Sequence, residues 1–344
     1  MTEQILMKEA HTGLNSNWIF SPLSLQLMLC LIASGARGLT LVQMLSSMCV
    51  ENVAELCSLS SKIVSVASSG KTEDMQRHFR CRVHRSRLQN TEEINSWAKN
   101  ATKGVIKNLI PHEVIDSETL AVLVNAFYFN ATWKEFDQST TQEQPFYFLD
   151  GKVLPVPFLS RSPYAEHFYG SSTDGFKILK IPHQMNDGDS RQFASYFFLP
   201  DKVDGLFELV HRINSKPEFL TQEFGLQKVE INPLRIPKFK ISYGFEASER
   251  QLGLALPFSN LAELTEMIEE SKHGGGGEAQ AKVSKVIHKS FFEVTEDKGR
   301  LAGWCGTFGE SVPTFIADHP FLLMELFFLR IGELKLEIRR MNSI

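Results

Sequence analysis

The stretch at residues 283–321 constrains the fold of this 344-residue chain more than any other segment. It begins with the β-branched and aromatic run VIHKSFFEV, which predicts a strand buried inside a sheet. The pattern ends at residues 295–299, and four glycines and a proline fall within 299–314 before FIADHPF resumes it. Such a long segment between two strands indicates either a functional loop or disorder. We predict that the fold displays this loop.

The first part of the chain has helical patterns. Residues 14–69 are helical in spacing, and Ser21 followed by Pro22 predicts a helix start with a serine N-cap. Thr40 is placed to cap the next helix. Helical spacing returns over residues 92–110, where Pro111 ends it.

Strands dominate the second part of the chain. The run LAVLVNAFYF at 120–129 predicts a strand buried on both faces. Strand patterns continue from residue 145, with a hairpin turn at Asp150-Gly151 and one helix over 204–213. Because helices and strands are segregated rather than alternating, we predict an α+β fold in a single domain over residues 1–344.

An arginine-rich stretch at residues 70–92 separates two helical regions and has little apolar periodicity, so we predict a loop or linker. Its arginines are Arg77, Arg80, Arg82, Arg85 and Arg87. A solvated surface loop and a patch for polyanions both remain open. His78, Cys81 and His84 have ligand-like spacing, but the sequence supplies no fourth ligand and we predict no metal site or cofactor.

The composition excludes several classes of function. A net charge of −4 gives no indication of nucleic acid as a partner, and no apolar run approaches the roughly 20 residues of a membrane span. The five cysteines are odd in number and form no CxxC pair, so we expect reduced thiols. No secretory signal is visible, and we expect an intracellular, cytoplasmic protein.

A set of short motifs occurs in a fixed order along the chain. They are Asn17 with FSPLS at 20–24, GARGLT at 35–40, INSW at 94–97, VNAFYF at 124–129 with Trp133 and Phe136, IPKFKI at 236–241, His288-Lys289, Glu293-Val294, and ADHPF at 317–321. Together these motifs resemble those of the serpin family, and its plant branch most closely. Members of this family without a signal peptide also occur in the extracellular space.

The resemblance implies an α+β fold with three β-sheets, about eight helices and an exposed reactive-centre loop. It implies no enzyme but a monomeric inhibitor of a serine or cysteine protease, acting as a suicide substrate through the loop at about 297–316. The protease cleaves this loop, which then inserts into the main sheet and traps the attached protease.

The resemblance also assigns roles to single residues. Ser21, Ser24, Asn125 and His288 resemble the polar cluster beneath the main sheet, where the sheet must open. Trp133 resembles the tryptophan at the point where the loop inserts, and Glu296 resembles the hinge glutamate. From its sequence context alone, His288 is either a satisfied core histidine or a switch.

Two regions depart in length or pattern from the family. At about 66–94 the chain has only the arginine-rich stretch where the family has a helix, an edge strand and a second helix. The main sheet would then lack a strand and expose an edge. The C-terminus, residues 325–344, lacks the family's final strand pattern.

The hinge departs in chemistry. Inhibitory loops begin with small residues because alternate side chains must enter a filled sheet, where excess volume costs roughly 1–3 kcal/mol per site. Here Gly299, Ala302 and Gly303 are small, but Arg300 would bury a charge and Trp304 is bulky.

The remainder of the loop gives no clear recognition residue. Counting along the family's loop places the scissile bond near Val312 and Pro313, and a proline after that bond resists most serine proteases. Cys305 is either a reactive or an inert thiol. The alternative is therefore a non-inhibitory or degenerate serpin that serves as an interaction protein. Asp318-His319 lacks a nucleophile elbow and does not indicate a hydrolase.

Overall fold

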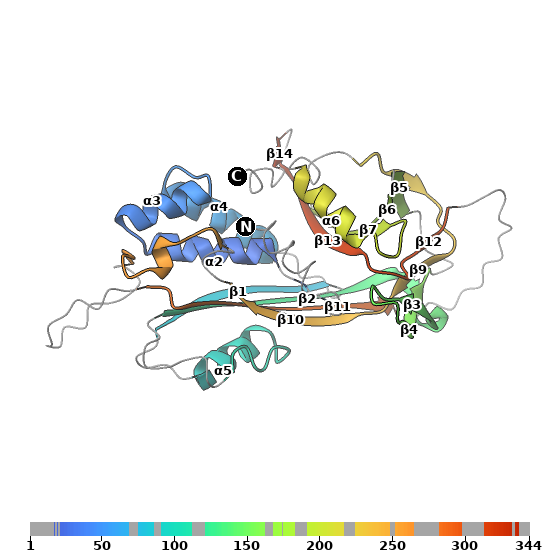
Figure 1. The fold of residues 1–344 in the computed structure, drawn as a ribbon, viewed down its shortest axis with the longest axis horizontal. Helices are drawn as coiled ribbons and strands as arrows, with labels where there is room; N and C mark the ends of the chain where they lie inside the picture. The colour runs from blue at the N-terminus through green and yellow to red at the C-terminus, as the bar shows by residue number, and fades with distance from the viewer. Residues whose placement is uncertain are drawn as a thin grey trace, which may run out of the picture.

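A computed structural model describes residues 17, 19, 21–68, 75–85, 91–111, 121–161, 168–173, 175–182, 191–216, 224–247, 252–264, 282–297, 313–331 and 334–336. These residues form three β-sheets with α-helices beside them, which confirms the predicted α+β class. Figure 1 shows the longest sheet with helices above and below it, and the other two sheets gathered towards one end.

The main sheet has the strand order β1-β2-β11-β10. Its strands are β1 (Met75–Arg85), β2 (Ala121–Asp137), β11 (Lys285–Asp297) and β10 (Lys240–Glu246). The two central strands, β2 and β11, run parallel to each other, whereas both outer pairs are antiparallel. Residues 122–129 of β2 are all buried, as the continuous apolar run predicted.

The prediction of a loop or linker at residues 70–92 is wrong over its centre, because Met75–Arg85 forms strand β1. This strand pairs with β2 along its whole length, from Met75 opposite Ala131 to Arg85 opposite Ala121. A long buried partner supplies backbone pairing that the composition of the segment does not reveal. Charged residues are also well tolerated at the edge of a sheet.

The two other sheets lie towards one end of the main sheet (Figure 1). One contains β12 (Phe315–Ile316), β9 (Leu234–Pro237), β4 (Val153–Ser160) and β3 (Gln142–Tyr147), in that order. The other contains β14 (Leu334–Leu336), β13 (Leu322–Ile331), β7 (Arg191–Pro200), β6 (Phe176–Pro182), β5 (Phe168–Thr173) and β8 (Gln227–Val229). The atypical C-terminal sequence thus continues a regular strand as far as Ile331.

Helices cover both faces of the main sheet (Figure 1). On one face lie α2 (Pro22–Ser34), α3 (Gly38–Ser47) and α4 (Val53–Ser68), and on the other lies α5 (Thr91–Ala101). Helix α6 (Leu206–Ser215) lies on the six-stranded sheet, and short 3-10 turns occur at Gln138–Thr140 and Leu256–Phe258. No described helix is long and apolar enough to cross a membrane.

Two predicted helix boundaries need correction. The helix predicted over 92–110 ends at Ala101, because the backbone turns out of the helix through positive φ angles at Lys103 and Gly104. The Asn95 side chain then accepts hydrogen bonds from the backbone N–H of Leu109 and Ile110 in the returning segment. Thr40 does not cap α3, which starts at Gly38. The Thr40 hydroxyl instead accepts from the Glu263 N–H, and the Glu263 carboxylate accepts from the Leu39 N–H at the helix start.

Candidate functional site: the seam between β2 and β11

The candidate site is the seam where β2 and β11 run side by side in parallel. Residue pairs follow in unbroken register from Lys285 opposite Val122 to Glu296 opposite Trp133. His288 and Asn125 are partners in this register, and both side chains are buried. Two polar side chains therefore face each other across the seam, inside an apolar sheet.

Helix α2 begins directly at this point. Ser21 is the N-cap, with extended backbone angles, and its hydroxyl accepts a hydrogen bond of 3.1 Å from the Ser24 N–H. Pro22 occupies the first helical position, where its missing N–H costs least. The predicted helix start is confirmed, and it brings the polar N-terminal turn of α2 against the sheet.

The N-terminal turn of α2 bonds to both strands of the seam. The Asn125 amide donates to the Ser24 carbonyl at 2.9 Å, which holds β2. The Ser21 N–H donates to His288 Nε2 at 3.4 Å, which holds β11. Separation of β2 from β11 must therefore break at least one of these bonds or move α2. We name Ser21, Ser24, Asn125, His288 and Ser290 the polar latch.

His288 is neutral in this latch. Its Nε2 accepts from the Ser21 N–H and lies 2.6 Å from the Ser290 hydroxyl, so the ring proton belongs on Nδ1. Complete burial lowers the pKa of His288 to about 3, because the charged form of the ring would lose its hydration. The Phe245 ring, 5.3 Å away between centroids, adds to this apolar surrounding.

The latch is incompletely satisfied. Ser24 Oγ, Asn125 Oδ1 and His288 Nδ1 are buried and have no hydrogen-bond partner among the described residues. A buried polar atom without a partner costs about 1–3 kcal/mol. The closed seam is consequently less stable at its centre than an apolar seam of the same shape.

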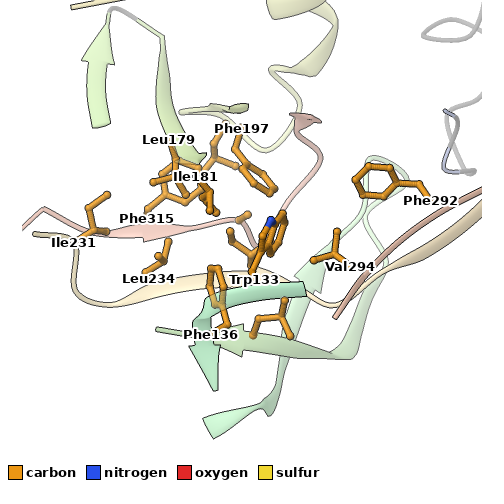
Figure 2. Packing of buried hydrophobic residues seen from close by; sticks show 14 of the residues in the cluster. Trp133, Phe136, Leu179, Ile181, Phe197, Ile231, Leu234, Phe292, Val294 and Phe315 are labelled. Carbon is orange, nitrogen blue, oxygen red and sulfur yellow. The ribbon is translucent and has the colours of Figure 1, made fainter. Parts of the chain in front are cut away.

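The end of the seam has a different character. Trp133, opposite Glu296 in the register, is fully buried, with its ring 5.5 Å from Phe136 and 5.6 Å from Phe197 between centroids. Figure 2 shows these rings with Phe292 and Phe315 in one apolar cluster. Strands of all three sheets contribute to this cluster, so the point at which β11 ends is where the sheets meet.

The predicted loop joins the end of β11 to β12, which is the first strand of the sheet β12-β9-β4-β3. Glu296 lies in β11, while Gly299, Arg300, Ala302, Gly303 and Val312 lie outside the described residues. Pro313 is exposed, and its carbonyl accepts from the Asn232 N–H at 3.0 Å. The Phe315 N–H then donates to the Pro233 carbonyl, which fixes the far end of the loop beside β9.

The Asp318-His319 pair has a structural role in this fold. His319 Nδ1 lies 2.7 Å from the Asp318 carboxylate, and Nε2 lies 2.7 Å from the Pro200 carbonyl. Both ring nitrogens are engaged, and the pair ties the start of β13 to the end of β7. The pair lies between β12 and β13, where neither residue is part of a strand.

The structure brings the predicted residues Ser21, Ser24, Asn125 and His288 together, and places Trp133 at the end of the same seam. Sequence reasoning missed Ser290, although a polar residue two positions after His288 on a strand shares its face and was a usable signal. No cluster of three metal-ligating side chains occurs among the described residues. His78, Cys81 and His84 fall in strand β1.

Comparisons with known proteins agree with this geometry. A family profile described as "Serpin (serine protease inhibitor)" matches residues 72–326. The chain is 37% identical to Serpin-ZXA of Oryza sativa subsp. japonica over 91% of its own length and 87% of the relative, and 36% identical to Serpin-ZX of Arabidopsis thaliana over 90% and 88%.

Solved structures give the same result. A structure described as "Arabidopsis AtSerpin1. Native Stressed Conformation" is similar with a TM-score of 0.79 and 32% identity, covering 95% of each chain. Uncleaved ovalbumin, at 21% identity, shares the fold with a TM-score of 0.73 over 94% of this chain and 95% of that one.

Proposed function

Because this chain belongs to the serpin family and has plant serpins as relatives, we propose that it inhibits a serine-type protease as a suicide substrate. The substrate segment is the loop at about 297–316, between the end of β11 and strand β12. After cleavage within this loop, the segment attached to β11 inserts between β2 and β11. The family is described as one of serine protease inhibitors.

The single observation that carries this proposal is the parallel seam. A chain that leaves the end of β11 and turns back runs antiparallel to β11, and therefore also antiparallel to β2. An inserted strand can thus form an antiparallel ladder on each side, and antiparallel pairs are slightly more stable per residue than parallel ones. At either outer pair of the main sheet, one of the two new ladders would be parallel.

The polar latch supports the same proposal. Its bonds from α2 to both strands hold the seam closed, and its unpaired buried atoms reduce the free energy needed to open it. Seam opening breaks the parallel ladder between β2 and β11, and insertion of a strand replaces that one ladder with two antiparallel ladders. The native chain is then a kinetically held state from which insertion releases free energy.

Incubation with trypsin-, chymotrypsin- and papain-like proteases tests the proposal. A complex that survives boiling in SDS, with one protease per chain, is the expected result. If the loop is cleaved and none of the three protease classes forms such a complex, inhibition by trapping is contradicted. A papain-like complex alone would assign the target to cysteine proteases rather than serine proteases.

A second candidate function follows from the hinge sequence. Arg300 and Trp304 stand where an inserting strand needs small residues, which favours a non-inhibitory serpin that acts as an interaction protein. Arg300→Ala distinguishes the two functions, because it removes the charge without adding volume. If the hinge limits trapping, this variant forms more SDS-stable complex than the unmodified chain. The thermal midpoint of the cleaved protein reports insertion independently of trapping.

A further inference from the structure

Strand β1 forms one edge of the main sheet. It pairs with β2 over all 11 residues of its length, and no other described strand pairs with it. In an antiparallel pair, alternate residues direct their N–H and C=O groups away from the partner strand. About half of the residues in β1 therefore direct backbone groups away from β2, and an added strand could pair with them along roughly 36 Å at 3.3 Å per residue.

The composition of this edge strand is strongly basic. Met75–Arg85 contains four arginines, at positions 77, 80, 82 and 85, and no aspartate or glutamate. The whole chain has 40 acidic and 36 basic residues apart from histidine, so this concentration of one sign is local to the strand. Charges of one sign repel a second strand of the same sign when they lie opposite each other.

This charge selects among the possible occupants of the edge. A second copy of β1 would place arginines against arginines, so the edge is unsuited to pairing with itself. Any polyanion is attracted by the arginines, but only a peptide backbone can also use the row of open N–H and C=O groups. We propose that β1 is a docking edge for an extended acidic peptide segment of a partner protein, which adds to the main sheet as a further strand.

The first experiment uses a fluorescein-labelled 11-residue peptide of alternating glutamate and threonine as the probe, followed by fluorescence anisotropy with the full chain. Saturable binding that weakens as salt is raised is expected. A peptide methylated on the backbone nitrogens of two central glutamates and two central threonines keeps the charge but loses N–H donors on both edges of the strand, and at least tenfold weaker binding is expected. Equal binding of both peptides would overturn the proposal in favour of a simple polyanion patch.

A matched pair of variants locates the site. Arg80→Gln with Arg82→Gln removes two charges from β1, and Lys202→Gln with Lys228→Gln removes two exposed charges elsewhere. The first variant should bind the glutamate-threonine peptide at least fivefold more weakly, and the second should bind it as the unmodified chain does. Equal affinities of the two variants, with circular dichroism showing both folded, would overturn the proposal.

Amide hydrogen exchange on the unmodified chain tests the inference without any substitution. Saturating peptide should slow exchange at alternate amides of residues 75–85, because those N–H groups gain acceptors. Unchanged exchange in β1 while the peptide is bound would overturn the proposal. Competition by heparin without any change in β1 exchange would likewise assign the arginines to polyanion binding.

Discussion

The centre and the end of the β2–β11 seam belong to the same two strands, yet they are held by opposite kinds of interaction. At the centre, the polar latch uses a few hydrogen bonds and leaves three buried polar atoms unpaired among the described residues. At the end, Trp133 lies in a cluster of aromatic rings drawn from all three sheets, and its Nε1 is the one polar atom there that is buried and unpaired among the described residues. We propose that the aromatic end provides stability and that the polar centre is the place where the seam opens.

The largest effect on stability is expected at the aromatic end. Trp133→Ala removes a buried indole whose ring contacts Phe136 and Phe197, and should lower the free energy of unfolding by about 3–5 kcal/mol. Urea unfolding followed by circular dichroism measures this loss. Tyr147→Ala, at a ring 39% exposed, serves as the control and should cost less than about 1 kcal/mol. Similar losses of unfolding free energy for both variants would show that the aromatic cluster does not stabilise the end of the seam.

Lowering the pH should destabilise the folded chain through His288 in the polar centre of the seam. The pKa of His288 is about 3 in the folded chain because of burial, whereas an unfolded histidine titrates near 6.5. Between these values the unfolded chain binds a proton that the folded chain does not, so His288 contributes a loss of stability as pH falls below about 6.5. The slope of this contribution approaches about 1.4 kcal/mol per pH unit.

A comparison with His288→Gln isolates this contribution from those of other groups. The difference in unfolding free energy between the two proteins should be constant above pH 7 and should shrink steadily from pH 6.5 to pH 5. A difference that stays constant over the whole range would show that His288 is not held neutral by burial.

Asn125→Ala should have a smaller effect on stability but a specific one on the seam. It removes the donor to the Ser24 carbonyl, at an expected cost of about 1–3 kcal/mol. Hydrogen exchange near the middle of β2 and β11 should accelerate more than exchange near Trp133. Asn260→Ala, at an exposed side chain that bonds to Lys282, should change neither quantity measurably. Uniform acceleration along both strands would mean that the seam has no preferred opening point.

Much of the seam could be predicted because its strands are continuous apolar runs. The runs at 120–129 and 283–294 predicted β2 and β11, and Ser21 with Pro22 predicted the start of α2. The prediction that Ser21, Ser24, Asn125 and His288 lie together came from the resemblance to a family. No local sequence pattern relates residues that are so far apart in the chain. Their contact follows from the parallel register of β2 and β11, which no spacing rule supplies.

Two features escaped prediction for different reasons. Strand β1 has the charge of a loop and becomes a strand because β2 offers a partner for all of its residues. The predicted helix over 92–110 stops early at Gly104, a local stop signal with a positive φ angle that the apolar spacing does not reveal. Tertiary pairing therefore outweighs the local pattern in β1, whereas the helix end follows a local signal.

The smallest expected effect tests whether the two ends of the seam are independent. Ser290→Ala removes the hydroxyl beside His288 Nε2 and leaves the Ser21 N–H, so it should cost only about 0.5–1.5 kcal/mol. Ser242→Ala, at an exposed serine on β10, is the matched control and should cost less than about 0.5 kcal/mol.

Ser290 pairs with Phe127, six residues from Trp133 and thus roughly 20 Å along the strand. The losses from Ser290→Ala and Trp133→Ala should therefore add within about 0.5 kcal/mol, whereas Ser290→Ala and Asn125→Ala should not. Strong coupling between Ser290 and Trp133 would mean that the polar latch and the aromatic cluster open as one unit. The seam would then have no separate opening point at its polar centre.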